Sequence, residues 1–349
     1  MPDSITRSRA PAANLLRWSL LILIAFLVGC FDKPSPQVVL QGETMGTTWQ
    51  ATVVDPQNLD EKALQAAIEN RLSDINALMS TYDPESELSQ FNALQSVEWQ
   101  PMATETLEII ETAHRVSKAT SGAYDVTLGS VSELWGFGQG NTPDTAPLLD
   151  DILLLLNDVG YQLLKISASR NKVRKLNENL QVDLSSLAKG YAVDQIGELI
   201  EAAGQTRYLA EIGGEIRTRG RAADEGMWKI GIEWPESAGT PEMTGIQVEN
   251  AHIASSGDYR NYEVIDGQRY THIIDGRSGY PISHGLASVT VLHGSTMRAD
   301  AWATAFMVLG FEESLQIANE KGLAVRFVIR EGDAFRVETT QVFDAYAIN

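Results

Sequence analysis

The sequence predicts an α+β fold, built mainly from antiparallel sheets with helices packed on them. Strand-like segments follow one another across short turns, as 206–212 and 214–221 do, and this spacing favours antiparallel pairing. Longer segments carry apolar residues every three or four positions, which is typical of amphipathic helices. Glycines follow these segments, where a helix often ends in a left-handed residue. This mixture indicates α+β, not a doubly wound parallel sheet.

Each helix is placed by an apolar stripe and each strand by a short run of strand-forming residues between turns. Helices are expected at 60–80, 103–120, 186–203, 296–309 and 311–321. The first has the clearest stripe, formed by Leu64, Ile68, Leu72, Ile75 and Met79. The glycines expected just past helix ends are Gly122, Gly204, Gly310 and Gly322. Strands are expected at 47–54, 162–166, 173–176, 180–184, 206–212, 214–221, 228–233, 244–249, 268–274, 287–293, 324–330 and 334–340.

The N-terminal region predicts export and anchoring. Arg7, Arg9 and Arg17 precede an apolar run at 20–28 that is too short to span a membrane comfortably and is typical of a secretory signal. The run ends in Leu27-Val-Gly-Cys30, which resembles a bacterial lipobox whose cysteine is acylated. We therefore expect a lipoprotein signal peptide at 1–29, a tether at 30–37 and one domain at 38–349, within which 138–150 and 221–227 are the weakest joints.

Cys30 is the expected lipidation site and the only cysteine of the chain, so its acylation would leave neither a disulfide nor a thiol nucleophile. An anchor that is never cleaved is the alternative, and it too would place the domain outside the cytoplasm. We expect a domain anchored by lipid at the periplasmic face of a bacterial inner membrane. Asp32 lies at a position that influences sorting, so the outer membrane stays open as a destination.

The charge of the chain excludes a nucleic-acid partner. The formal net charge is −19, and residues 1–29 carry three Arg and one Asp, so the mature chain is near −21. An acidic protein that binds a phosphate-bearing ligand needs local positive charge, either from a metal or from a lysine such as Lys189. About 44% of the residues are apolar, which is enough to bury a proper core.

Two segments together predict a metal-assisted pyrophosphate site. In Asp183-Leu-Ser-Ser-Leu-Ala-Lys-Gly190, a carboxylate, hydroxyls and a lysine surround a strand-to-helix turn that offers free N–H groups to an anion. In Ala299-Asp-Ala-Trp-Ala-Thr-Ala305, Asp300 and Thr304 are four residues apart and share a helix face. A sparse set of hard oxygen ligands suits Mg²⁺, whereas Ca²⁺ normally takes more protein oxygens. Taken singly, the first segment is more typical of a helix cap, and the second is more typical of a threonine bonded to its own helix turn.

Further segments combine glycine with polar residues, as turns and close ligand contacts do. They are Gly42-Glu-Thr-Met-Gly-Thr-Thr48, Met79-Ser-Thr-Tyr-Asp-Pro-Glu-Ser-Glu-Leu-Ser89, Gly122-Ala-Tyr-Asp-Val-Thr-Leu-Gly129, Trp135-Gly-Phe-Gly138, Ile212-Gly-Gly-Glu-Ile216, Ile253-Ala-Ser-Ser-Gly-Asp-Tyr259 and Thr271-His-Ile-Ile-Asp-Gly-Arg-Ser-Gly-Tyr-Pro281. With these motifs in the family's order from about residue 40 to 310, the chain strongly resembles the ApbE family, the FAD:protein FMN transferases. The resemblance covers almost the whole mature chain.

The resemblance implies a Mg²⁺-dependent reaction with FAD as substrate. FAD is split at its pyrophosphate, FMN is joined by a phosphoester to a Ser or Thr of an acceptor protein, and AMP leaves. Acceptors implied for the family include subunits of Na⁺-translocating NADH:quinone reductase and of Rnf-type complexes. The FAD contacts fall on Met45, Tyr82, Ala123, Tyr124, Asp125, Asp183, Lys189 and Ile274. The metal ligands fall on Ser186, through its backbone carbonyl, and on Asp300 and Thr304.

His272 occupies the position of the family's histidine and is the expected general base, with Asp275 as the alternative. The chain departs from the family pattern in two places. It has Asp183-Leu-Ser-Ser where many members have Asp-Leu-Gly-Gly, and Asp275-Gly-Arg where Asp-Pro is usual. Two other functions use nearly the same residues: an FAD pyrophosphatase that gives FMN and AMP, and a flavin-binding lipoprotein without catalytic activity.

Overall fold

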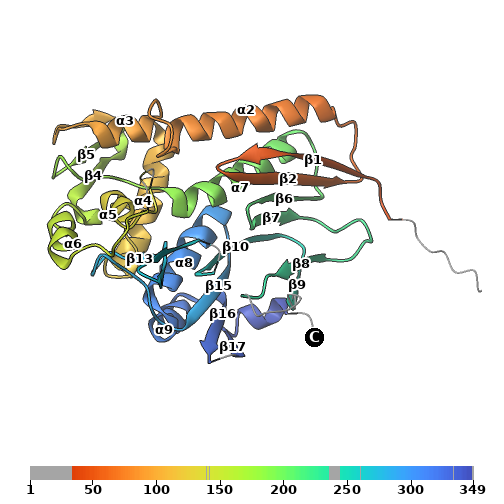
Figure 1. Cartoon of the computed structure of the whole chain (residues 1–349). Helices are drawn as coiled ribbons and strands as arrows, with labels where there is room; N and C mark the ends of the chain where they lie inside the picture. The colour runs from red at the N-terminus through yellow and green to blue at the C-terminus, as the bar shows by residue number, and fades with distance from the viewer. Residues whose placement is uncertain are drawn as a thin grey trace, which may run out of the picture.

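The framework of the molecule is an eight-stranded sheet with the strand order β1-β2-β6-β7-β10-β15-β16-β17, in which all neighbours are antiparallel (Figure 1). The computed structural model describes residues 34–138, 140, 142–235, 244–259, 261–332 and 334–347. The sheet strands are β1 (Gln37–Thr44), β2 (Thr47–Val54), β6 (Tyr208–Ile212), β7 (Glu215–Arg219), β10 (Ala251–Gly257), β15 (Leu286–His293), β16 (Ala324–Glu331) and β17 (Ala334–Thr339). The predicted α+β class with antiparallel sheets is confirmed.

Smaller sheets lie around this framework. They are formed by β3 (Gln100–Pro101), β5 (Lys172–Lys175) and β4 (Leu164–Ser167); by β8 (Trp228–Ile232) and β9 (Thr244–Val248); by β11 (Tyr262–Ile265) and β12 (Gln268–Thr271); and by β13 (Ile274–Asp275) and β14 (Tyr280–Pro281). The last two hairpins follow each other directly in the chain, and His272 lies between them. A residue in that position is held from both sides by paired backbone.

The helices are α2 (Glu61–Met79), α3 (Glu87–Ala93), α4 (Thr104–Ala119), α5 (Gly129–Leu134), α6 (Leu149–Leu156), α7 (Ser185–Ala202), α8 (Thr296–Leu309) and α9 (Phe311–Lys321). Short 3₁₀ turns are η1 (Tyr161–Leu163), η2 (Ala168–Arg170) and η3 (Phe343–Tyr346). None of the helices in the described part of the chain has the length and apolar character needed to cross a membrane.

The core has two sides. Helices α7 and α8 pack against each other and cover one face of the sheet, with α7 on β6 and β7 and α8 on β10 and β15. Helices α2 and α4 contact α7 from further out. The other face is covered by the β8–β9 hairpin and η3, which form a separate apolar cluster with Val54, Ile253 and Leu292. The pair α7–α8 is therefore buried between the sheet and the outer helices, so its geometry is fixed by packing.

Most expected helices and strands form, with a few corrections. The stripe of α2 is buried as expected, and Gly122, Gly204, Gly310 and Gly322 all have positive φ at their turns. The expectation of a strand at 180–184 was wrong: this segment makes one isolated bridge, from Gln181 to Leu128. Strands β1, β3, β10, β11 and β14 and helices α3, α5 and α6 had not been expected.

Candidate functional site

The candidate site is built around the crossing of α7 and α8. Gly190 of α7 lies so close to α8 that a Cβ atom placed on it would be 2.5 Å from the carbonyl oxygen of Thr296. Such a distance is too short for any side chain, so only glycine allows the two backbones to approach this far. The Oδ2 atom of Asp300 in α8 accepts a hydrogen bond of 3.0 Å from the backbone N–H of Gly190.

This bond places two predicted metal ligands together. In an α-helix the N–H of residue 190 points toward the carbonyl oxygen of residue 186. A carboxylate that accepts from Gly190 therefore lies next to the Ser186 carbonyl. Thr304 is one turn further along α8 and half-buried. The hydrogen bond from Gly190 and the spacing along α8 therefore place Ser186, Asp300 and Thr304 near one another, and their role as metal ligands stays a prediction.

Tyr124 closes the site beside the start of α7. Its hydroxyl is 2.8 Å from the Oγ atom of Ser186. Burial raises the pKa of Tyr124 far above its ordinary value, and the nearby charges of Asp300, Asp125 and Asp183 act in the same direction. The phenol is therefore a neutral hydrogen-bonding group at physiological pH. The carboxylate of Asp183 accepts a bond of 2.8 Å from the N–H of Ser185 and so holds the turn that starts α7.

A buried ion pair lies next to Asp300. The Nζ atom of Lys189 is 2.9 Å from Oε1 of Glu215, a residue that is only 2% exposed. The other oxygen of Glu215, Oε2, is buried and has no hydrogen-bond partner within the described structure. Burial raises the pKa of Glu215 to about 8; the charge of Lys189 opposes this rise and that of Asp300 adds to it. Two buried acids, Glu215 and Asp300, therefore lie beside Lys189.

Sequence reasoning missed Glu215. The segment Ile212-Gly-Gly-Glu-Ile216 had been noted for its glycines, but no role was given to its acid. The available signal was an acidic residue directly after a Gly-Gly turn at the start of a strand. Its partner, Lys189, lies on another element, and only the packing of α7 on β7 shows that the two belong together.

Two tight turns form the rim next to Lys189. Met45 and Gly46 have φ of 49° and 72°, so β1 and β2 are joined by a two-residue hairpin with both central residues left-handed. A Cβ on Gly213, in the β6–β7 turn, would be 3.1 Å from Thr47 and 3.6 Å from Cδ of Lys189. The predicted FAD contact Met45 is therefore at the edge of the site, on a backbone that has little freedom.

His272 has the geometry of a general base. Its Nδ1 atom is 2.9 Å from the carbonyl oxygen of Asn261, which can only accept, so Nδ1 carries the proton and Nε2 keeps a free lone pair. Burial lowers the pKa of His272; the bond to Asn261 opposes this, and the charge of Lys189 adds to the lowering. The imidazole is thus neutral near pH 7. The charge of Asp183 also acts on this ring and opposes the lowering of its pKa.

Asp275, the alternative base, is engaged in an ion pair. Arg277 donates to it from Nε at 3.0 Å and from Nη2 at 2.7 Å, and the backbone N–H of Arg277 adds a bond of 2.8 Å. The oxygens of Asp275 are therefore occupied by Arg277, and an acceptor hydroxyl would have to compete with that side chain for them. This geometry favours His272 as the base, and the role of either residue stays a prediction.

The remaining predicted FAD contacts differ in how deeply they are buried. Ala123 is fully buried, and its carbonyl accepts a bond of 2.9 Å from the N–H of Gly276. Both carboxylate oxygens of Asp125 are used inside the protein, by Thr127 and by the backbone of Tyr161. Ile274 is buried in β13, which packs against α8. Tyr82 is 68% exposed, which leaves its ring free to stack on a ligand.

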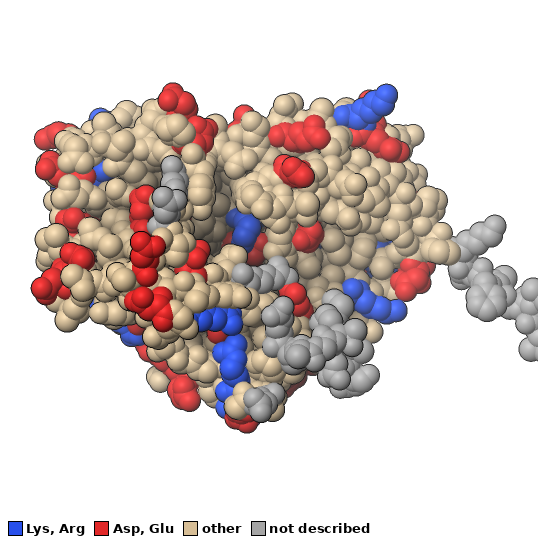
Figure 2. Space-filling view, viewed as in Figure 1, with Lys and Arg blue, Asp and Glu red and all other residues tan. Residues whose placement is uncertain are grey.

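The face of the molecule over α7, α8 and β13 is hollowed near its centre, and a Lys or Arg side chain lies inside the hollow beside acidic ones (Figure 2). The described residues contain no cluster of three or more His, Cys, Asp or Glu side chains suited to a metal. One carboxylate, one hydroxyl and one carbonyl are a ligand set of another kind, and they fit Mg²⁺. The expected lipidation site, Cys30, lies outside the described residues.

Comparison with known proteins gives a consistent result. The model of the ApbE family matches residues 45–327. A FAD:protein FMN transferase of Vibrio cholerae is 39% identical over 327 residues, covering 93% of this chain and 97% of the relative. One of Escherichia coli K12 is 34% identical over 345 residues, covering 96% and 98%. The solved structure of the flavin transferase ApbE from Vibrio cholerae matches with a TM-score of 0.84 at 38% identity, covering 90% of this chain and all of that one.

Proposed function

This chain belongs to the ApbE family, and we propose that it is a FAD:protein FMN transferase that moves the FMN half of FAD onto a hydroxyl of an acceptor protein. The observation that carries this proposal is the bond from Gly190 to Asp300, because it brings Ser186, Asp300 and Lys189 to one place. The family match and the relatives, which are flavin transferases by name, support it.

We infer that Ser186, Asp300 and Thr304 hold Mg²⁺. Their oxygens suit this ion, and the raised pKa of the buried Asp300 is what a carboxylate shows when it lacks enough positive charge around it. Burial is the main cause of that rise, and Lys189 opposes it. When bound, Mg²⁺ would neutralise charge on the pyrophosphate and on the departing AMP.

The residues of the chain supply the remaining chemistry. Lys189 lies where it can pair with a phosphate oxygen, and the positive end of the α7 helix dipole adds positive potential. The hydroxyl oxygen of the acceptor attacks the phosphorus on the FMN side, and Nε2 of His272 takes the hydroxyl proton. The bond from that phosphorus to the bridging oxygen breaks, and AMP leaves with the bridging oxygen and its electron pair. Transfer of this kind depends mainly on position and on charge neutralisation.

We propose that the acceptor is a membrane-associated flavoprotein and that this enzyme is anchored beside it by lipid at Cys30. The support comes from the sequence alone: the lipobox-like Leu27-Val-Gly-Cys30 and the strongly acidic mature chain. Subunits of Na⁺-translocating NADH:quinone reductase or of Rnf-type complexes are the acceptors to test first, and the periplasmic face of the inner membrane is the proposed location.

The proposal is tested by mixing residues 31–349 with FAD, Mg²⁺ and a candidate acceptor, followed by mass spectrometry of the acceptor. We expect a mass increase equal to one FMN and the release of AMP. An Asp300→Ala variant, or the parent protein with a chelator, should give neither product. FMN and AMP without attachment would instead support an FAD pyrophosphatase, and uncleaved, bound FAD would support a binding lipoprotein.

A further inference from the structure

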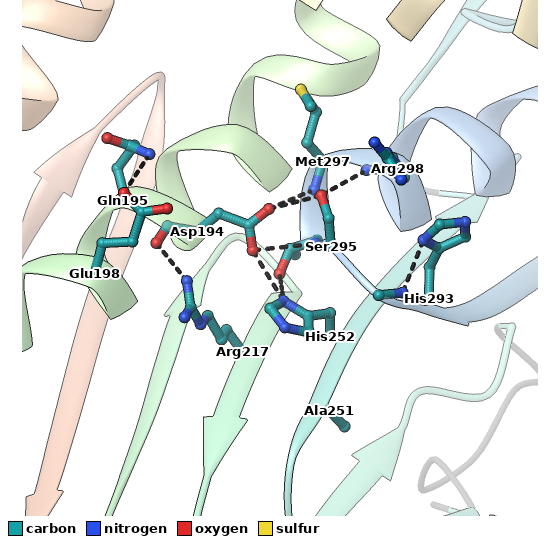
Figure 3. Close-up of polar contacts among 12 residues, drawn as sticks. Asp194, Gln195, Glu198, Arg217, Ala251, His252, His293, Ser295, Met297 and Arg298 are labelled. Carbon is teal, nitrogen blue, oxygen red and sulfur yellow. Dashed lines mark hydrogen bonds and ion pairs between the residues drawn. The ribbon is translucent and has the colours of Figure 1, made fainter. Parts of the chain in front are cut away.

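The carboxylate of Asp194 lies one turn after Gly190 in α7 and faces the first turn of α8 (Figure 3). It accepts hydrogen bonds from the backbone N–H groups of Thr296 at 3.0 Å and Met297 at 3.1 Å. The hydroxyl of Ser295 donates a third bond at 2.9 Å, and Nδ1 of His252 a fourth at 2.9 Å. Asp194 is therefore a cap for α8 that is supplied by a neighbouring helix.

The carboxylate of Asp194 stabilises the start of α8 in two ways, through hydrogen bonds and through its charge. The first N–H groups of a helix lack partners within it, and a negative charge at that end is stabilised by the helix dipole. Burial would raise the pKa of Asp194, but the bonds from His252 and Thr296 lower it below its ordinary value, so the group is anionic. The other charged or titratable groups near it are Arg217, which donates to the Asp194 backbone carbonyl at 2.7 Å, and His293, whose pKa is lowered mainly by burial.

The two helices are braced in both directions. Asp194 of α7 binds the start of α8, and Asp300 of α8, one turn further on, binds Gly190 of α7, one turn further back. Between these bonds, Gly190 allows the backbones to touch. Two such contacts, one turn apart, fix both the sliding and the rotation of α8 relative to α7. The position of Asp300 and Thr304 relative to Ser186 depends on this register.

We propose that Asp194 is a positioning residue for the Mg²⁺ and pyrophosphate site, acting through the register of α7 and α8. The inference rests on the proposed function, because it concerns the same site. Asp194 touches no predicted ligand itself. Partners that orient metal ligands typically contribute about 10–100-fold to metal affinity, and misplacement by about 1 Å can cost about 100-fold in rate.

The test compares Asp194→Asn with Glu198→Gln in the full chain. Glu198 is a matched control because it lies one turn further along α7, is exposed, and binds only Gln195 among the contacts of Figure 3. Mg²⁺ affinity is measured by calorimetric titration, and kcat and KM for FAD are measured at saturating Mg²⁺. We expect Asp194→Asn to weaken Mg²⁺ binding by about tenfold or more and to lower kcat with little change in KM. Glu198→Gln should match the parent.

A variant that is destabilised far from the site shows whether a loss of Mg²⁺ affinity comes from misplaced ligands or from lower stability of the whole fold. Phe343→Leu changes a buried residue on the opposite face of the sheet, in the cluster that β8, β9 and η3 form. It should lower Tm without changing Mg²⁺ affinity, while Asp194→Glu should recover part of the lost affinity. Should Asp194→Asn fail to fold, Ser295→Ala removes one bond of the brace and should weaken Mg²⁺ binding in the same direction.

The proposal is overturned if Asp194→Asn, or Ser295→Ala in its place, keeps the parent Mg²⁺ affinity within a factor of two. It is also overturned if Phe343→Leu loses affinity to the same extent as Asp194→Asn. Hydrogen exchange of the metal-free protein gives a further readout, and amides of 296–300 should exchange faster in Asp194→Asn. A parent protein that binds Mg²⁺ yet transfers no FMN would contradict the proposed function while leaving this comparison valid.

Discussion

At the scale of single residues, one hydrogen bond fixes the tautomer of His272, the proposed general base. Because the Asn261 carbonyl keeps the proton on Nδ1, the unprotonated Nε2 is the atom available to the substrate. The lowered pKa of the ring keeps it in this form near neutral pH. A base of this kind acts in the transition state and contributes little to holding FAD.

We therefore expect His272→Ala to reduce the rate of transfer by about 10²–10⁴-fold while the dissociation constant of FAD hardly changes. Rates are measured with enough FAD to saturate each variant, and binding is measured separately by fluorescence. Asp275→Asn, assayed side by side, should retain most of the rate because its carboxylate is already paired with Arg277. A near-normal rate for His272→Ala together with a collapse for Asp275→Asn would assign the base to Asp275.

A second prediction at the scale of single residues concerns the ion pair between Lys189 and Glu215. Lys189→Met should lower both Tm and turnover, because it removes a cation from the site and leaves Glu215 buried without its partner. Adding Glu215→Gln to that variant should restore much of the Tm but none of the turnover. Thermal unfolding and FMN transfer of the two single variants and the double variant give the comparison. If turnover returned together with Tm, the lysine would serve only the fold.

Helical spacing explains why some of the candidate site residues could be grouped from the sequence. Asp300 and Thr304 lie on one turn of one helix, so their shared face follows from the sequence. Glu215 and Asp194 could not be found in this way, because their partners lie on other elements and the bonds exist only after α7 has packed on β7 and α8. The ion pair of Asp275 could not be predicted either. The sequence shows that Arg277 is two residues away, but it does not show that the loop brings the Arg277 guanidinium onto the Asp275 carboxylate.

At the scale of elements, the crossing of α7 and α8 depends on Gly190. Gly190→Ala would place a methyl group 2.5 Å from the Thr296 carbonyl, so the helices must move apart. Forced separation of packed backbones costs about 1–3 kcal/mol, and here it also weakens the bond to Asp300. We expect a lower Tm and weaker Mg²⁺ binding, measured by scanning calorimetry and by titration.

Gly294→Ala is the matched control for that variant. Gly294 precedes α8, a Cβ on it would meet nothing within 4 Å, and no positive φ requires glycine there. Its stability and Mg²⁺ affinity should match those of the parent. Equal behaviour of the two alanine variants would show that close approach at Gly190 does not matter for the site.

The elements that sequence patterns did not predict share a physical cause. Strand β10 is rich in small residues and lies between two paired strands, so neither face shows a clear apolar alternation. In α6 the run at 153–156 is continuously leucine, which hides any helical period, and Leu154 is 67% exposed. The segment 180–184 alternates correctly, and Leu180, Val182 and Leu184 are all buried, but it packs into the core with only a single bridge. The alternation of apolar and polar residues in this segment therefore reflects burial of every second side chain and not pairing in a sheet.

At the scale of the whole molecule, stability should depend on pH through His114. Burial lowers its pKa to about 4, the charge of Lys165 adds to this, and its Nε2 has no hydrogen-bond partner in the described structure. In the unfolded chain His114 becomes protonated near pH 6.5, whereas in the folded protein it becomes protonated only near pH 4. Stability is thus complete above about pH 6.5 and falls as the pH drops toward 4, by on the order of 2–3 kcal/mol.

Urea unfolding of the parent and of His114→Phe between pH 7 and pH 4 measures this effect. The phenylalanine cannot titrate and keeps a ring against Tyr161, whose ring centroid is 5.9 Å from that of His114. We expect its free energy of unfolding to decline less steeply over this range than that of the parent. Parallel declines would mean that other groups, such as the carboxylates with lowered pKa, account for the whole dependence.

The proposed anchor gives the last prediction, which concerns the orientation of the molecule. The tether enters at β1, which begins at Gln37, and the β1–β2 hairpin at the other end of this strand reaches the rim of the site at Met45 (Figure 1). A strand rises about 3.3 Å per residue, so the site lies roughly one strand length from the point of attachment. Six residues lie between Cys30 and Gln37, so the Cα atoms of these two residues are at most about 25 Å apart. The enzyme would therefore act only on acceptors close to the membrane.

We expect Cys30→Ala to release the protein from the membrane or to stall its processing. Transfer to a soluble acceptor fragment should persist. Cys30 precedes β1 and is not one of the proposed catalytic, FAD-binding or metal-binding residues. Transfer to an acceptor embedded in the same membrane should fall, since the local concentration that the tether provides is lost. Fractionation, the mass of the N-terminus and flavin labelling of the two acceptors are the measurements. Unchanged membrane attachment with normal processing would refute the lipid anchor, and equal loss with both acceptors would show that Cys30→Ala damages the fold instead of the attachment.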